Sequence, residues 1–166
     1  MQLEYFESLI GIAQLAVALA GFSGVVVVFG SMKKGGWHPG DRLRLGFLIE
    51  SSLTAAAFSL IALILLYWFN EDPNTSWIIT SSLWSIFMVW SLYSSHARIQ
   101  VNKQTHDDID QFANRLVTFI FSLLILLQIY NSLVIKEFWP LLAALVFNLT
   151  GATMQFVRLI KSAFHD

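Results

Sequence analysis

Long runs of apolar residues dominate the chain. Five segments of about 20 residues or more carry no charged residue, apart from one glutamate in the second segment. A helix needs about 20 mostly apolar residues to cross the ~30 Å hydrocarbon core of a bilayer. The pattern therefore predicts an all-α, polytopic transmembrane helix bundle that forms a single transmembrane domain over residues 1–166, without a soluble domain. The expected spans are residues 9–32, 45–69, 76–95, 116–135 and 138–157.

The last two spans are separated only by Lys136 and Glu137. This charged pair, followed by Trp139 and by Pro140 in the first turn of the next helix, favours two helices over one. A turn is also expected at Pro73 and its polar neighbours, between the second and third spans. Asp41 is expected to cap the second helix. A four-span arrangement, with one of the last two segments at the membrane interface, is the alternative.

Composition agrees with a membrane location. The chain is 56% hydrophobic and 13% charged, whereas soluble domains are about 25% charged. It contains no cysteine, which excludes disulfides, thiolate metal sites and a cysteine nucleophile. The net charge of −1 gives no reason to expect binding to genomic nucleic acid.

The basic residues predict an orientation. Nine of the ten Lys and Arg residues fall on one side of the five spans, and Lys136 falls on the other. Because basic loops stay on the cytoplasmic side, we expect a multi-pass protein of the cell (inner) membrane with its N-terminus outside and its C-terminus inside. The nine residues are Lys33, Lys34, Arg42, Arg44, Arg98, Lys103, Arg115, Arg158 and Lys161.

Four amide side chains and the hydroxyl of Thr80 are singled out as polar groups well inside the predicted spans. Such groups are costly in hydrocarbon unless they are paired or hydrated. Two interpretations stay open: a layer of hydrogen bonds between helices, or the lining of a polar path. The residues concerned are Gln14, Thr80, Gln128, Asn131 and Asn148.

Glu50 is the acidic residue inside a span. It lies at a similar depth to Arg115 and Arg158, so an ion pair with one of them is one interpretation. The other places Glu50 at the inner mouth of a pore, where several copies would form an acidic ring. Glu50 is therefore a candidate for an ion pair or a pore mouth, and Arg115 and Arg158 are the candidate partners of the ion pair.

Small residues follow one face of the first span at helical spacing, namely Ala13, Ala16, Ala20 and Gly24. Membrane helices pack through such faces because backbones can approach closely there. Packing within the chain is the first interpretation, and a subunit interface is the second.

The basic loop after the first span contains Lys33, Lys34, Arg42 and Arg44. These residues fit the orientation rule and attract anionic lipid. A second interpretation is a binding surface for a cytosolic anion, such as a nucleotide or oligonucleotide signal, with Trp37 or His38 stacking on a base. A sensor protein could present the same signal.

Signatures of enzymes are weak. The four histidines are scattered without metal-ligand spacing. The acids after His106 precede the fourth span, where aspartates cap helices and complement the helix dipole. We therefore expect no enzyme activity, no metal and no cofactor.

Three classes of function follow. The first is a homo-oligomeric channel or pore-forming effector, opened by a cytosolic anionic ligand. The spans contain more polar side chains than lipid contact would favour, and the chain is too small to enclose a pore by itself, so several copies would form one together. An accessory or scaffold membrane subunit without its own conduction path is the alternative. A small transporter is disfavoured because transporters are built from internal repeats, and no repeat is visible.

Two stretches carry a resemblance. Ala20-Gly21-Phe22-Ser23-Gly24 in the first span and Trp37-His38-Pro39-Gly40-Asp41-Arg42 before the second resemble small multi-span bacterial membrane proteins of uncharacterised families. Some proteins of this build are effectors in phage defence, where a nucleotide-sensing partner controls a channel. The resemblance concerns architecture and assigns a role to no individual residue.

Overall fold

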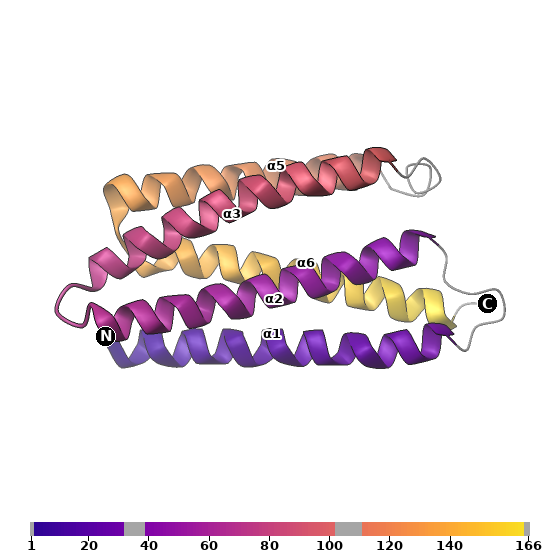
Figure 1. The fold of residues 1–166 in the computed structure, drawn as a ribbon, viewed down its shortest axis with the longest axis horizontal. Coiled ribbons are helices and arrows are strands. Elements are labelled where there is room, and N and C mark those ends of the chain that lie inside the picture. Colours follow the sequence, from indigo (N-terminus) through magenta and orange to yellow (C-terminus); the bar gives the residue numbers. More distant parts are fainter. Residues whose placement is uncertain (1, 32–38, 102–110, 165–166) are drawn as a thin grey trace. The chain divides into compact units, whose positions relative to one another are not determined.

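A computed structural model describes residues 2–31, 39–101 and 111–164, and every element in these ranges is a helix (Figure 1). A five-residue π-helix, η1, continues the fourth long helix. The elements are α1 (Gln2–Ser31), α2 (Pro39–Trp68), α3 (Pro73–Val101), α5 (Gln111–Tyr130), η1 (Asn131–Ile135) and α6 (Phe138–Phe164).

Five helices are long and apolar enough to cross a membrane, as the sequence predicts. The observed helices extend beyond most of the predicted spans, because hydropathy marks only the hydrocarbon zone whereas helical hydrogen bonding continues into the polar flanks. In α1, for example, Glu4 lies in the first turn, where a carboxylate interacts favourably with the helix dipole. The candidate spans are Leu3–Val28, Gly40–Trp68, Pro73–Ser95, Arg115–Ile135 and Phe138–Ser162.

The chain divides into two compact units, and the long helices α2 and α6 each contribute to both of them. Unit 1 comprises Met1–Leu63 and Leu145–Asp166, and unit 2 comprises Ile64–Ala144.

The core of unit 1 forms where α1, α2 and α6 meet. Val26 of α1, Leu48 of α2, and Ala152 and Leu159 of α6 are buried in one apolar cluster. Partly buried apolar residues of the same three helices surround it, namely Leu19, Leu45, Phe156 and Ile160. The aromatic ring of Phe22 lies 6.2 Å from that of Phe156, between centroids, and extends the α1–α6 contact.

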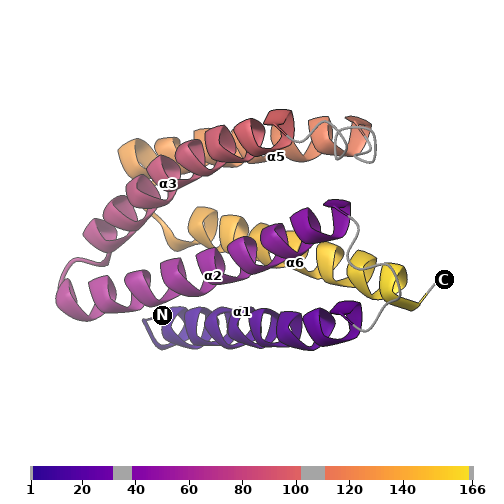
Figure 2. The same cartoon turned by 45° about the vertical axis from the view of Figure 1, so that its right-hand side comes forward.

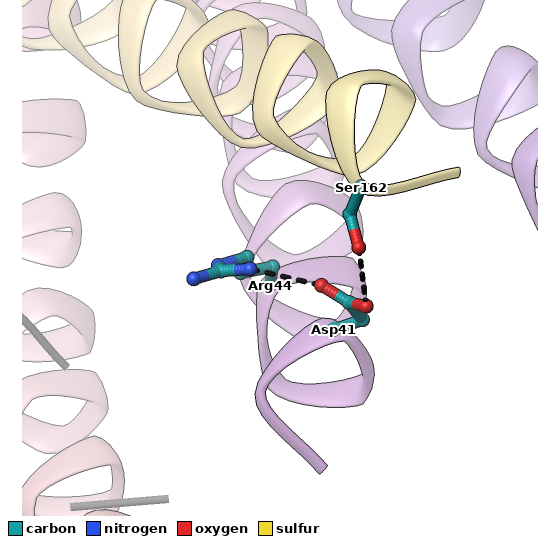
Figure 3. A network of polar contacts seen from close by, with 3 residues as sticks. All are labelled: Asp41, Arg44 and Ser162. Carbon is teal, nitrogen blue, oxygen red and sulfur yellow. Dashed lines mark hydrogen bonds and ion pairs between the residues drawn. The ribbon is translucent and has the colours of Figure 1, made fainter. Parts of the chain in front are cut away.

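A polar contact joins the beginning of α2 to the end of α6 (Figure 3). The Ser162 hydroxyl donates to Asp41 Oδ2 at 2.7 Å, and Arg44 Nη1 donates to Asp41 Oδ1 at 2.9 Å. The expectation that Asp41 caps α2 is wrong, because α2 already begins at Pro39 and Asp41 lies within its first turn. Its carboxylate instead ties two helices together and fixes their antiparallel register.

Unit 2 is built around α3, which runs alongside α5 and η1 (Figures 1 and 2). A turn between the second and third spans is confirmed, but it precedes Pro73, since α2 ends at Trp68 and Pro73 is already the first residue of α3. Asp72 precedes α3 and caps it: its carboxylate accepts a hydrogen bond from the Thr75 hydroxyl, and its carbonyl accepts from the Thr75 N–H.

The separation of the last two spans at Lys136 and Glu137 is also confirmed. Lys136 ends η1 with φ of 58°, a left-handed conformation, and its N–H donates to Asn131 O at 2.8 Å. Pro140 lies in the first turn of α6, as expected. Two helices therefore form instead of one, and a single left-handed residue reverses the chain.

Candidate functional site

Asn131 is the first residue of η1, directly after α5, and is fully buried, and protein groups satisfy both ends of its amide. Its Nδ2 donates to Ser81 Oγ of α3 at 2.8 Å and to Glu137 O at 3.0 Å, while its Oδ1 accepts from the Glu137 N–H at 3.0 Å. One side chain thus closes the turn between α5 and α6 and attaches that turn to a third helix.

Gln128, one turn before Asn131, is also fully buried. Its Nε2 donates to Pro140 O at 2.6 Å, which adds a second tie between α5 and α6, while its Oε1 has no protein partner. Trp77 and Phe138 pack nearby in the same unit with ring centroids 5.1 Å apart. We call the set Ser81, Gln128 and Asn131, together with the carbonyls of Glu137 and Pro140, the hairpin clasp.

Thr80 is buried in α3 next to Ser81, and its hydroxyl donates to Ser76 O at 2.8 Å in its own helix. Three of the five predicted polar residues, Thr80, Gln128 and Asn131, thus lie within unit 2. Gln128 and Asn131 donate to other helical segments, as a layer of hydrogen bonds between helices requires, whereas the Thr80 hydroxyl donates within α3.

Asn148 differs from Asn131. It lies in unit 1 with 1% of its surface exposed, yet neither Nδ2 nor Oδ1 has a hydrogen-bond partner among the described residues. Ser52 and Ser59 of α2 are completely buried in the same unit, and within the described part of the chain their hydroxyls also have no partner. The side chains of Asn148, Ser52 and Ser59 are therefore buried without hydrogen bonds to protein of the kind that Asn131 makes in the hairpin clasp.

Gln14 is exposed on α1. Within the span Leu3–Val28 it lies 11 residues from one end and 14 from the other, which is about 17 and 21 Å at 1.5 Å per residue. The amide therefore sits close to the middle of the span, on a face of α1 that the described residues of unit 1 leave exposed.

The predicted small-residue face of α1 is only partly packed. Ala13 and Ala16 are buried and Ala20 is half-buried, whereas Gly24 is exposed with no atom within 4 Å of an added Cβ. The buried side of α1 shifts along the helix to Ser23 and Val26, as happens when a helix crosses its neighbours at an angle. Packing within the chain thus uses the first half of this face.

The charged candidates are spread over the structure. Glu50 is half-buried in α2, whereas Arg158 and Arg115 are exposed in α6 and α5. Arg42 is exposed and Arg44 bonds to Asp41, while Lys33, Lys34, Trp37, His38 and His106 lie outside the described residues. Among the residues that the structure describes, no group of three or more His, Cys, Asp or Glu side chains is placed to hold a metal ion.

Sequence reasoning missed Ser52, Ser59 and Ser81. The signal that could have found them is spacing: Ser52 and Ser59 are seven residues apart on α2, and residues seven apart share a helix face. Serine is unremarkable in membrane helices, however, and nothing local marks which hydroxyl meets an amide fifty residues away.

The chain matches no known protein family, no curated protein and no solved structure.

Proposed function

We propose that the protein is a subunit of a homo-oligomeric membrane channel that assembles through the uncovered face of α1. The observation that carries the proposal is the exposed amide of Gln14 near the middle of the first span. Transfer of an unpaired amide into hydrocarbon costs several kcal/mol. Lipid contact is therefore an unfavourable environment for this side chain.

The surroundings of Gln14 suit a second helix. Gly11, Ala18 and Gly21 lie on the same side of α1, and an added Cβ on either glycine meets no atom within 4 Å. Small residues allow two helix backbones to approach closely. The amide of Gln14 carries both donors and an acceptor, so identical copies satisfy one another around a symmetry axis.

A ring of Gln14 amides would give the oligomer a polar path. The amide has no net charge, so the path would pass small hydrated ions with little preference for charge sign. Control of this path by an anionic ligand on the basic side is part of the proposal, and the exposed Arg42 is available for such a contact.

An accessory subunit without a conduction path is the second candidate. The hairpin clasp favours it, because Gln128 and Asn131 use their amide donors for packing. In that case a helix of another membrane protein covers the α1 face.

The test compares oligomeric state and conductance. Purified protein in lipid nanodiscs should have the mass of several copies, and Gln14→Leu should shift it towards the monomer. Thr150→Val is the matched control, since Thr150 is also exposed but its hydroxyl already donates to Val146 O of its own helix. It should leave the mass unchanged.

Planar-bilayer recordings distinguish the two candidates. A channel gives single-channel currents that Gln14→Leu reduces or abolishes. A multimer without current removes the channel and leaves the accessory subunit. A monodisperse monomer refutes self-assembly.

A further inference from the structure

Four side chains with buried, unpartnered polar atoms lie on the faces of α2 and α6 that meet in unit 1. On α2, Ser52 and Ser59 belong to a completely buried stripe with Leu48 and Ala55. On α6, Asn148 shares a stripe with Ala152, Leu159 and the half-buried Gln155. Leu48 packs in one cluster with Ala152 and Leu159, so these two stripes face each other.

The axial positions of these side chains follow from the Asp41–Ser162 hydrogen bond. Asn148 lies 14 residues before Ser162, and Ala55 lies 14 residues after Asp41, so the antiparallel helices place them at one level. Ser52 is then three residues to one side of that level and Ser59 four residues to the other, or about 4.5 and 6 Å along the axis. The same register puts Leu48 level with Gln155, between Ala152 and Leu159, in agreement with the observed cluster.

Asn148 is therefore flanked by two serine hydroxyls within the reach of one bridging molecule on each side. In residues 2–31, 39–101 and 111–164, no protein group bonds to either amide atom of Asn148 or to either hydroxyl, and Gln155 adds a buried Oε1 without a partner in the same ranges, seven residues further along α6. Buried polar groups of this kind are normally satisfied by ordered water when protein does not supply the partner.

The residues around Asn148 determine whether a ligand bound there can carry a charge. Residues 51–60 of α2 and 144–153 of α6 contain no ionisable side chain, and neither do residues 9–28 of α1. An ion at this depth would have no counter-charge, which makes its burial unfavourable. The ligand must be neutral, and it must both donate and accept hydrogen bonds.

We propose that Ser52, Ser59 and Asn148 form an internal site for ordered water between α2 and α6. The site lies within one protomer and does not depend on the proposed assembly through α1. Water bridges the amide to both hydroxyls, so that the middle of unit 1 is hydrated although it is closed to bulk solvent.

The test uses magic-angle-spinning NMR on protein with ¹⁵N-labelled asparagine side chains in lipid bilayers. Magnetisation transfer from water protons to the Nδ2 hydrogens of Asn148 should be severalfold stronger than transfer to those of Asn131. Asn131 is the matched control, because it is an equally buried asparagine whose amide is paired by protein groups. The two signals are assigned by their loss in Asn148→Leu and Asn131→Leu.

A second variant tests the serines. Ser52→Ala combined with Ser59→Ala should reduce the transfer to Asn148 severalfold and leave the Asn131 signal in place, which also reports that unit 2 is intact. If the double variant does not fold, Ser59→Ala alone carries the same comparison. Transfer to Asn148 as weak as that to Asn131 means that the site is dry and overturns the proposal. Strong transfer that survives the loss of both hydroxyls overturns the assignment of the serines.

Discussion

Replacement of Asn131 by leucine should destabilise the packing of α6 against α3 and α5. The side chain makes three hydrogen bonds, to Ser81 Oγ and to the carbonyl and N–H of Glu137. Interhelical hydrogen bonds in membranes contribute about 0.6 kcal/mol on average and at most about 1.7 kcal/mol. Loss of three such bonds, with the Ser81 hydroxyl left buried, gives an expected destabilisation of roughly 2–4 kcal/mol.

The matched control is Ser132→Ala, the next residue along the chain. The Ser132 hydroxyl donates to Ile129 O within its own helical segment, so its removal breaks no contact between helices. The expected change in free energy of unfolding is within about 0.5 kcal/mol. Asn131→Asp separates the accepted bond from the donated ones, because it retains the acceptor for the Glu137 N–H and loses both donations of Nδ2, to Ser81 Oγ and to Glu137 O.

The assay is reversible unfolding in bicelles. The quantity measured is the free energy of separating the α5–α6 hairpin from α3. A label on α3 and a second on α6 report their separation. If Asn131→Leu unfolds with a free energy within 0.5 kcal/mol of the unmodified protein, the clasp does not hold these helices, and the reasoning from its hydrogen bonds is refuted.

Three further outcomes are expected. Lys136→Gly should stabilise the protein by about 0.5–1 kcal/mol, because glycine adopts the left-handed conformation at φ 58° without strain. The control Lys161→Gly, in the last turn of α6, should destabilise the protein by less than about 1 kcal/mol, and equal signs would contradict the argument. Asp41→Ala should lower the free energy of unfolding by about 1 kcal/mol. Its combination with Ser162→Ala should lower it by less than the sum of the two single changes, because each change removes the same hydrogen bond. Ser8→Cys should react with an impermeant thiol reagent from outside intact cells, with no background from native cysteine; labelling from the cytosolic side alone would reverse the predicted orientation.

The sequence by itself determined the helices and their number. Apolar runs of spanning length are a local property, and so are the charged pair at Lys136 and Glu137 and the following Pro140 that separate the last two spans. Local signals were weaker at helix ends: α1 begins at Gln2 instead of the predicted residue 9, because a helix does not stop where its hydropathy falls. Likewise Asp41 reads locally as a cap but serves as a link to α6.

Only the tertiary structure decided which polar side chains have partners. Asn131 and Asn148 are the same residue type in similar apolar segments, and both are buried. Asn131 meets Ser81, fifty residues away, and the turn that follows it, whereas Asn148 meets no protein donor or acceptor. Hydropathy fixes how deep a residue lies along its own helix, but the rotation and register between helices depend on contacts distant in sequence. The same reason separates Gln14, left uncovered on α1, from Gln128, enclosed within the clasp.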